Sequence, residues 1–150
     1  MFSDFANTMK RTFTTEADLA TFAAQFARRL QAGDVVAFAG PLGSGKTTFI
    51  RAIVQERLGC DPTTSPTFTF RHRYESTVPN EPAIEHLDFF RIRDASEVQE
   101  LGLEEVFDGD SIVLVEWWEH APQLLPRRRT EITLEGVGNG PRELLLDDRA

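Results

Sequence analysis

Residues 40–47 carry the glycine-rich pattern with which many proteins hold phosphate groups. The segment reads Gly-Pro-Leu-Gly-Ser-Gly-Lys-Thr and fits G-x-x-x-x-G-K-[ST] at every position. Glycines let backbone N–H groups close around phosphate oxygens, Lys46 brings a positive charge, and the Thr47 hydroxyl is a hard ligand for Mg²⁺. We predict a nucleotide and Mg²⁺ site that contains Gly40, Pro41, Leu42, Gly43, Ser44, Gly45, Lys46, Thr47 and Thr48.

The elements on either side of this segment are those that such a loop requires. An apolar run over residues 35–39 predicts a buried strand before it, and residues 46–58 predict a helix after it, with Gly59 at its C-cap. A chance match in a glycine-rich turn would lack this strand–loop–helix context. The context favours a true phosphate-binding loop.

Two acids are candidates to act beside the phosphates. Glu116 follows the apolar strand 112–115, a position where a carboxylate holds Mg²⁺ or its waters; the alternative is a surface glutamate. Asp88 lies among apolar and aromatic residues, where a carboxylate is costly unless it has a use. It is a candidate for binding a Mg²⁺ water or orienting the attacking water, and the alternative is an ion pair with Arg91 or Arg93. His86 shares its face, and we interpret it as a structural, hydrogen-bonded histidine.

Other residues are candidates for contacts at the edge of the site. Thr67, in a proline-rich loop, would sense a γ-phosphate as part of a switch, or would belong to an ordinary turn. Trp117 follows Glu116 and either packs in the core or covers the nucleotide. None of the asparagines begins the N-K-x-D stretch of guanine-specific domains, which favours ATP over GTP.

The remaining pattern predicts an α/β fold in three layers. A helix begins after Thr15 with apolar residues at helical spacing, and residues 1–11 form either a frayed leader or an edge element. Strands over 68–74 and 83–90 predict one β-hairpin, and strands over 130–134 and 143–146 predict a second. With a central strand over 111–115, we expect a mixed, mostly parallel central sheet with helices on both faces. A short helix is expected after Ser96. The 150 residues fit a single domain, 1–150.

Composition restricts the partners. The net charge of −8 and the isoelectric point near 4.9 disfavour tight direct binding of nucleic acid. One cysteine, Cys60, which we expect to be inert, fits a reducing cytoplasm, and no apolar run is long enough for a membrane span. The cluster Arg127–Arg129 is either a solvated turn or a contact to a partner or phosphate.

Five motifs in order resemble the TsaE (YjeE) family of small bacterial P-loop ATPases. They are GPLGSGKTT at 40–48, SPTF at 65–68, HLDFFR at 86–91, ELGL at 100–103 and VEW at 115–117. The resemblance implies a role in making N6-threonylcarbamoyladenosine beside the tRNA anticodon. It implies weak ATPase activity that depends on the TsaB–TsaD pair, and contact with tRNA only through that complex.

The resemblance also implies roles for individual residues. Residues 40–47 would bind phosphates, Thr47 and Glu116 would serve Mg²⁺, and Asp88 would be catalytic together with Glu116 and Lys46. Trp117, Arg142 and Glu16 would lie on the nucleotide, Glu16 on its adenosine side. Two other functions stay open on the residues alone: a small-molecule kinase with Arg127–Arg129 as its lid, and a nucleotide-gated scaffold with little turnover.

Overall fold

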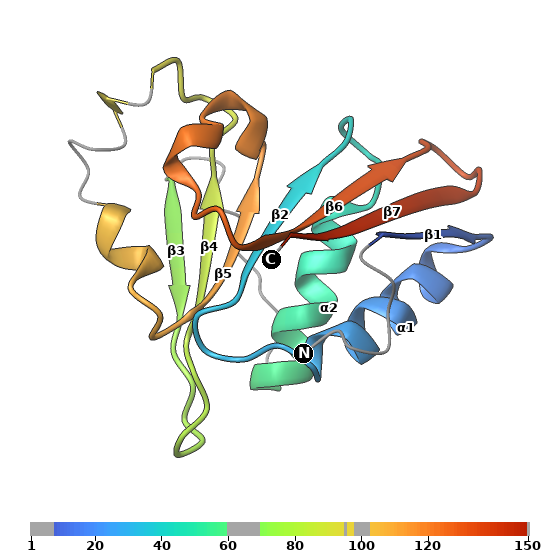
Figure 1. The fold of residues 1–150 in the computed structure, drawn as a ribbon. Coiled ribbons are helices and arrows are strands. Elements are labelled where there is room, and N and C mark those ends of the chain that lie inside the picture. Colours follow the sequence, from blue (N-terminus) through green and yellow to red (C-terminus); the bar gives the residue numbers. More distant parts are fainter. Residues whose placement is uncertain (1–7, 60–69, 95, 98–102, 150) are drawn as a thin grey trace.

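A seven-stranded sheet forms the centre of the molecule in the computed structural model, which describes residues 8–59, 70–94, 96–97 and 103–149 (Figure 1). The strands lie in the order β1-β7-β6-β2-β5-β4-β3. Their bounds are β1 Thr8–Phe13, β2 Val35–Ala39, β3 Arg71–Tyr74, β4 Ile84–Asp88, β5 Ile112–Glu116, β6 Arg129–Glu135 and β7 Arg142–Arg149.

The four central strands are parallel and the outer strands are antiparallel. Strand β2 pairs in parallel with β5 and β6, and β4 joins β5 in parallel. The hairpins β3–β4 and β6–β7 and the edge pair β1–β7 are antiparallel. The predicted mixed sheet and both hairpins are confirmed, but parallel pairing is confined to the centre and accounts for half of the pairings rather than most.

The two α-helices with bounds in the described residues pack on one face of this sheet (Figure 1). Helix α1 (Glu16–Ala27) begins at Thr15, whose side chain accepts a hydrogen bond from the Asp18 N–H, and it packs against α2 (Lys46–Leu58). The residues predicted to form its apolar face are all buried: Leu19, Phe22, Ala23, Phe26 and, just beyond the helix, Leu30. Phe49 of α2 fits among the rings of Phe22, Phe26 and Phe38. This aromatic cluster fixes α2, and therefore the loop before it, against β2.

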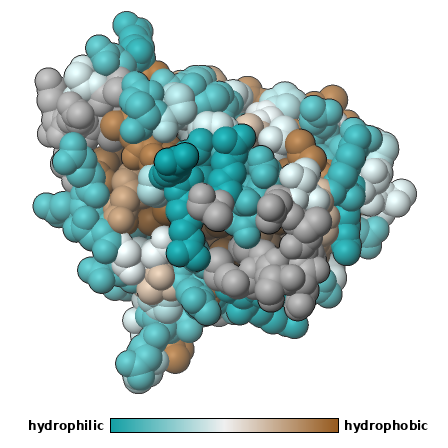
Figure 2. Space-filling view, viewed as in Figure 1, coloured by the Kyte–Doolittle hydropathy of each residue, from teal (hydrophilic) through white to brown (hydrophobic). Residues whose placement is uncertain are grey.

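Short 3₁₀ helices cover the other face. They are η2 (Leu103–Phe107), η3 (Trp118–His120) and η4 (Pro122–Leu124), and they pack over Val113, Val115 and Leu87 in a second apolar cluster. Three layers are therefore present as predicted, but in the described part of the chain the second helical layer is 3₁₀ rather than α. Hydrophilic side chains cover most of the visible surface (Figure 2).

Several element bounds differ from the prediction. Residues 8–13 form the edge strand β1, which confirms the edge element for residues 8–11, whereas residues 1–7 lie outside the described residues. Strand β7 runs to Arg149, three residues past the predicted end, because Thr130 and Asp148 are hydrogen-bonded and Glu131 pairs with Arg149 across the hairpin. Cys60, Thr67 and most of the helix expected after Ser96 lie outside the described residues. No described helix combines the length and apolar character needed to cross a membrane.

Candidate functional site

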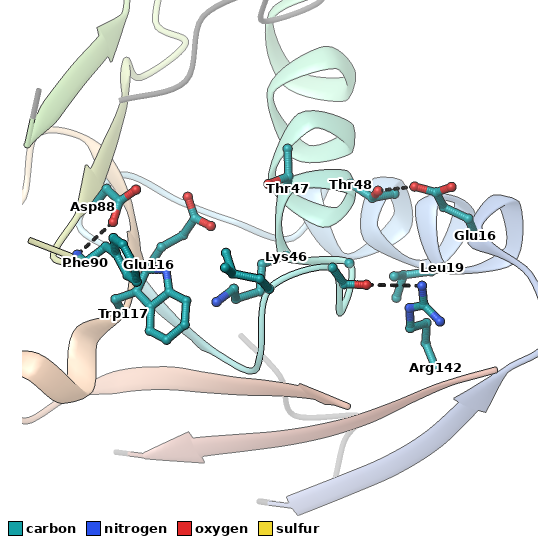
Figure 3. Close-up of a pocket in the computed structure, with 13 residues that line it drawn as sticks. Glu16, Leu19, Lys46, Thr47, Thr48, Asp88, Phe90, Glu116, Trp117 and Arg142 are labelled. Carbon is teal, nitrogen blue, oxygen red and sulfur yellow. Dashed lines mark hydrogen bonds between the residues drawn. The ribbon is translucent and has the colours of Figure 1, made fainter. Parts of the chain in front are cut away.

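The carboxyl ends of β2, β4 and β5 meet at one edge of the sheet, where ligands bind in open α/β folds. A cavity of about 280 Å³ opens there beside the 40–47 loop (Figure 3). The residues that line it are Glu16, Leu19, Leu42, Gly43, Gly45, Lys46, Thr47, Thr48, Asp88, Phe90, Glu116, Trp117 and Arg142. Segments far apart in the sequence thus converge on one cavity.

The loop between β2 and α2 depends on glycine at two positions. Gly40 has φ of +140°, and a Cβ there would lie 2.2 Å from the Leu134 carbonyl oxygen. Gly45 caps α2 with φ of +108°, and its Cβ would lie 2.6 Å from Leu19 Cδ2. L side chains rarely adopt such angles, and neither position has room for one. The glycines let the loop pass closely between β6 and α1 and turn into the helix.

Lys46 is buried at the start of α2 in spite of its charge. Its Nζ donates a hydrogen bond to the Gly40 carbonyl and lies 3.5 Å from the centroid of the Trp117 ring. Burial lowers the pKa of Lys46, and the carboxylates of Glu116, Glu119 and Asp88 oppose this shift. The ammonium group therefore lies in an acidic cavity.

Asp88 and Glu116 lie side by side at the ends of β4 and β5 and face the start of α2 (Figure 3). Asp88 Oδ1 accepts a hydrogen bond from the Phe90 backbone N–H at 2.9 Å. Burial raises the pKa of Asp88, the neighbouring charge of Glu116 raises it further, and the Phe90 donor acts against them. With the Thr47 hydroxyl, these carboxylates form a set of hard oxygen ligands of the kind that Mg²⁺ prefers.

A buried histidine contacts one of these acids. His86 Nε2 lies 2.8 Å from Glu116 Oε2, and the two side chains are 7% and 8% exposed. The predicted hydrogen-bonded histidine is therefore confirmed, and its partner is a candidate metal ligand.

The opposite wall of the cavity comes from α1 and the β6–β7 hairpin. Glu16 accepts a hydrogen bond from the Thr48 hydroxyl, which joins α1 to α2. Arg142 donates to the carbonyl oxygens of Gly43, Gly138 and Gly140. Arg142 thus ties the 40–47 loop to the turn of the hairpin.

Most of the predicted site residues therefore come together around one cavity. Gly40, Pro41 and Ser44 belong to the loop but do not line the cavity, because Ser44 is fully buried and Gly40 lies against Leu134. Sequence reasoning missed Leu19 and Phe90 as lining residues. The spacing of Leu19 in its helix predicts a core residue and gives no sign of the cavity. Phe90 lies two residues after Asp88, and this position could have indicated that it lines the site.

The arginine cluster lies elsewhere. Arg128 and Arg129 line a separate cavity of about 390 Å³ with Asp34, where β6 and the parallel strand β2 begin. The 40–47 loop follows the other end of β2. Arg129 also pairs with Glu131 at 2.9 Å and donates to the Pro126 carbonyl oxygen. These two arginines therefore do not cover the candidate site.

Comparison with known proteins gives consistent results along most of the chain. The family model "Threonylcarbamoyl adenosine biosynthesis protein TsaE" matches residues 13–144. Relatives named tRNA threonylcarbamoyladenosine biosynthesis protein TsaE are 39% identical in Bacillus subtilis (75% of this chain, 68% of the relative) and 36% identical in Rickettsia typhi (87% and 89%). The relative in Mycobacterium tuberculosis is 34% identical (81% and 76%).

A solved structure is also similar. The crystal structure of Bacillus subtilis YdiB superimposes with a TM-score of 0.77 at 29% identity, over 95% of this chain and 86% of the other. The likeness therefore extends over nearly the whole of this chain. With the sequence match over residues 13–144, it follows that this chain belongs to the TsaE family.

Proposed function

We propose that this protein is a Mg²⁺-dependent ATPase subunit that supports threonylcarbamoyladenosine modification of tRNA, acting through a TsaB–TsaD complex. The observation that carries the proposal is the convergence of Lys46, Thr47, Asp88 and Glu116 on the cavity beside a glycine-rich loop. The tRNA role follows from the names of the relatives. Contact with tRNA would be indirect, since the net charge is −8.

The charges of the cavity fit a metal-bound phosphate better than a free anion. Three carboxylates, those of Glu16, Asp88 and Glu116, line a cavity whose cations are Lys46 and the carbonyl-bound Arg142. A bare triphosphate would meet repulsion there, and a divalent cation would remove it. No group of three or more His, Cys, Asp or Glu residues in the described ranges could hold a metal ion. Mg²⁺ usually keeps waters and shares phosphate oxygens, so Thr47 and Glu116 would hold it together with the nucleotide.

Each residue then has a defined task. Lys46 would leave the Gly40 carbonyl to contact the β- and γ-phosphates, and Thr47 and Glu116 would hold Mg²⁺. The bound ion would neutralise charge that develops on the transferring phosphoryl group. Asp88, oriented by the Phe90 N–H, would accept a hydrogen bond from the attacking water. Trp117 and Phe90, with ring centroids 5.0 Å apart, form an apolar wall of the cavity.

The test is phosphate release from Mg·ATP by the wild-type chain and by Lys46→Ala, each with and without TsaB–TsaD. We expect slow release alone, faster release with the partners, and none above background in the variant. Unchanged release by folded Lys46→Ala would overturn the proposal. Nucleotide binding without release would indicate a gated scaffold, and labelled phosphate on a metabolite would indicate a kinase. Tighter binding of GTP than ATP would contradict the choice of base.

A further inference from the structure

His86 occupies a position from which it can control the candidate metal ligand. It lies on β4, on the same face as Asp88, and Asp88 is directly opposite Glu116 of β5. His86 is paired with Leu114, two residues before Glu116, and its Nε2 lies 2.8 Å from Glu116 Oε2. We propose that His86 is a positioning residue that fixes the Glu116 carboxylate in the orientation that serves Mg²⁺. This inference rests on the proposed function.

The direction of the hydrogen bond follows from its chemistry. A carboxylate that serves Mg²⁺ can only accept a hydrogen bond, so in the proposed role Nε2 carries the hydrogen and donates it to Oε2. That bond leaves Oε1 of Glu116 available to a metal ion or its water. A glutamate without such a partner has several rotamers, and fixing one of them costs conformational entropy each time a ligand binds. The histidine has already fixed the rotamer before nucleotide binds.

The surroundings give this task to His86 rather than to another group. Within the described residues, His86 is the one group hydrogen-bonded to the Glu116 side chain. The nearby ammonium of Lys46 is engaged with the Gly40 carbonyl and the Trp117 ring. Asp88 is a like charge and repels Glu116. Without His86, the carboxylate would be free to turn away from Asp88 and from the metal position.

Asp88 is oriented by an equivalent device made of backbone. Its Oδ1 accepts a hydrogen bond from the Phe90 backbone N–H, a donor that every residue except proline would supply at this position. Each of the two acids at the sheet edge thus has one donor that sets its orientation. Only the donor of Glu116 is a side chain, so it can be changed without altering the backbone.

The experiment compares three variants of His86 in the full chain. Gln places its Nε2 amide near the position of the imidazole Nε2, whereas Asn is too short to reach Glu116 and Ala has no donor. ADP affinity is measured by calorimetry with and without Mg²⁺, and the ratio gives the gain in affinity linked to the metal. We expect His86→Asn and His86→Ala to reduce this gain about 10-fold or more, as loss of a partner to a metal ligand usually does. His86→Gln should keep most of the gain, and affinity without Mg²⁺ should not change.

Other outcomes would show that His86 is structural, that it acts on another group, or that the proposed function is wrong. An undiminished gain in His86→Ala, with only a lower melting temperature, would mean that His86 is structural and would overturn the inference. In a Glu116→Gln background, His86→Asn should cause no further loss of the gain, and a further loss would show that His86 acts on another group. If the wild-type chain shows no gain with Mg²⁺, the proposed function fails first, and this inference with it. Circular dichroism identifies variants that do not fold. If His86→Ala and His86→Asn do not fold, a gain kept by folded His86→Gln supports the inference, and a gain lost in it would overturn the inference.

Discussion

Two acids on the same short strand, Glu85 and Asp88, have opposite electrostatic environments. Glu85 is 1% exposed and accepts hydrogen bonds from Arg71 at 2.6 and 2.8 Å and from Arg73 at 2.7 Å. Burial raises its pKa, but the two guanidinium groups outweigh burial and lower it overall. Asp88, three residues later, has a pKa raised by burial and by the charge of Glu116.

The difference separates an acid that serves the fold from one that is available for chemistry. Glu85 has its charge compensated within the protein, so the folded state favours its ionised form. Asp88 and Glu116 share one nearby ammonium, which is itself desolvated. The pKa values of Lys46 and Asp88 are both shifted, and groups with shifted pKa values cluster at functional sites. The predictions below test that contrast.

The largest expected effect comes from removal of a cation beside each acid: Lys46 beside Asp88, and Arg71 beside Glu85. Lys46→Ala should reduce phosphate release by about 10²-fold or more, because Lys46 serves the transferred phosphate, and should keep the melting temperature. Arg71→Ala is the matched control: it leaves Glu85 with one guanidinium, so it should lower the melting temperature and keep hydrolysis. Enzyme assays and thermal melts of both variants check this contrast, and the reverse pattern would refute it.

Neutralising each glutamate should give the next largest effect. Glu116→Gln keeps the shape but loses the charge beside Mg²⁺, so nucleotide should still bind while hydrolysis falls about 10²-fold. Glu85→Gln should cost about 2 kcal/mol of folding free energy. This is less than the cost of breaking a fully buried ion pair, because both arginines are more than a third exposed. Urea denaturation gives the second quantity, and a stable but inactive Glu85→Gln would contradict the division of roles.

Asp88→Asn should affect turnover more than stability. The folded environment disfavours the charge of Asp88, so a neutral side chain of the same shape should not lower the melting temperature. Partner-stimulated hydrolysis should fall if Asp88 orients the attacking water. If turnover stays complete and only the melting temperature falls, then Asp88 is structural and its assignment here is wrong.

The smallest effect is a difference in the pH dependence of stability. The folded pKa of Glu85 lies below its unfolded value of about 4.5, so its contribution is present above that pH and is lost as pH falls through the folded pKa. Asp88 has the opposite sign, and its ionisation reduces stability as pH rises above about 3.8. Melting temperatures between about pH 3 and 7 should fall less steeply in acid for Glu85→Gln. For Asp88→Asn, the difference between the melting temperature of the variant and that of the wild type should increase as the pH rises.

Local patterns in the sequence predicted the elements around the site. The loop, the strand before it and the buried face of α1 follow from spacing alone. The rule for parallel strands predicted the position of Glu116, and the cost of burying a carboxylate singled out Asp88. The loop, the strand and the helix face depend on residues close in sequence, and the position of Glu116 depends on a general property of sheets. They were therefore accessible without a structure.

Contacts that depend on the register between neighbouring strands could not be predicted from the sequence. The run Ile-Glu-His-Leu-Asp does not show which acid is compensated, because that depends on β3 placing Arg73 directly opposite Glu85. The partner of His86 depends likewise on the alignment of β4 with β5. The position of Arg128 and Arg129 at the far edge follows from the direction of β6, which the sequence does not state.

Arg142 has a consequence for protein engineering. Its guanidinium binds carbonyl oxygens of the 40–47 loop and of the β6–β7 turn together, although about a hundred residues separate the two segments in the chain. A chimera that receives the 40–47 loop of a relative, but not the relative's segment corresponding to residues 136–142, would keep the motif. It would lose the matched arginine contacts that hold the loop in shape. The two segments therefore form one exchangeable module, to be transplanted, randomised or redesigned together.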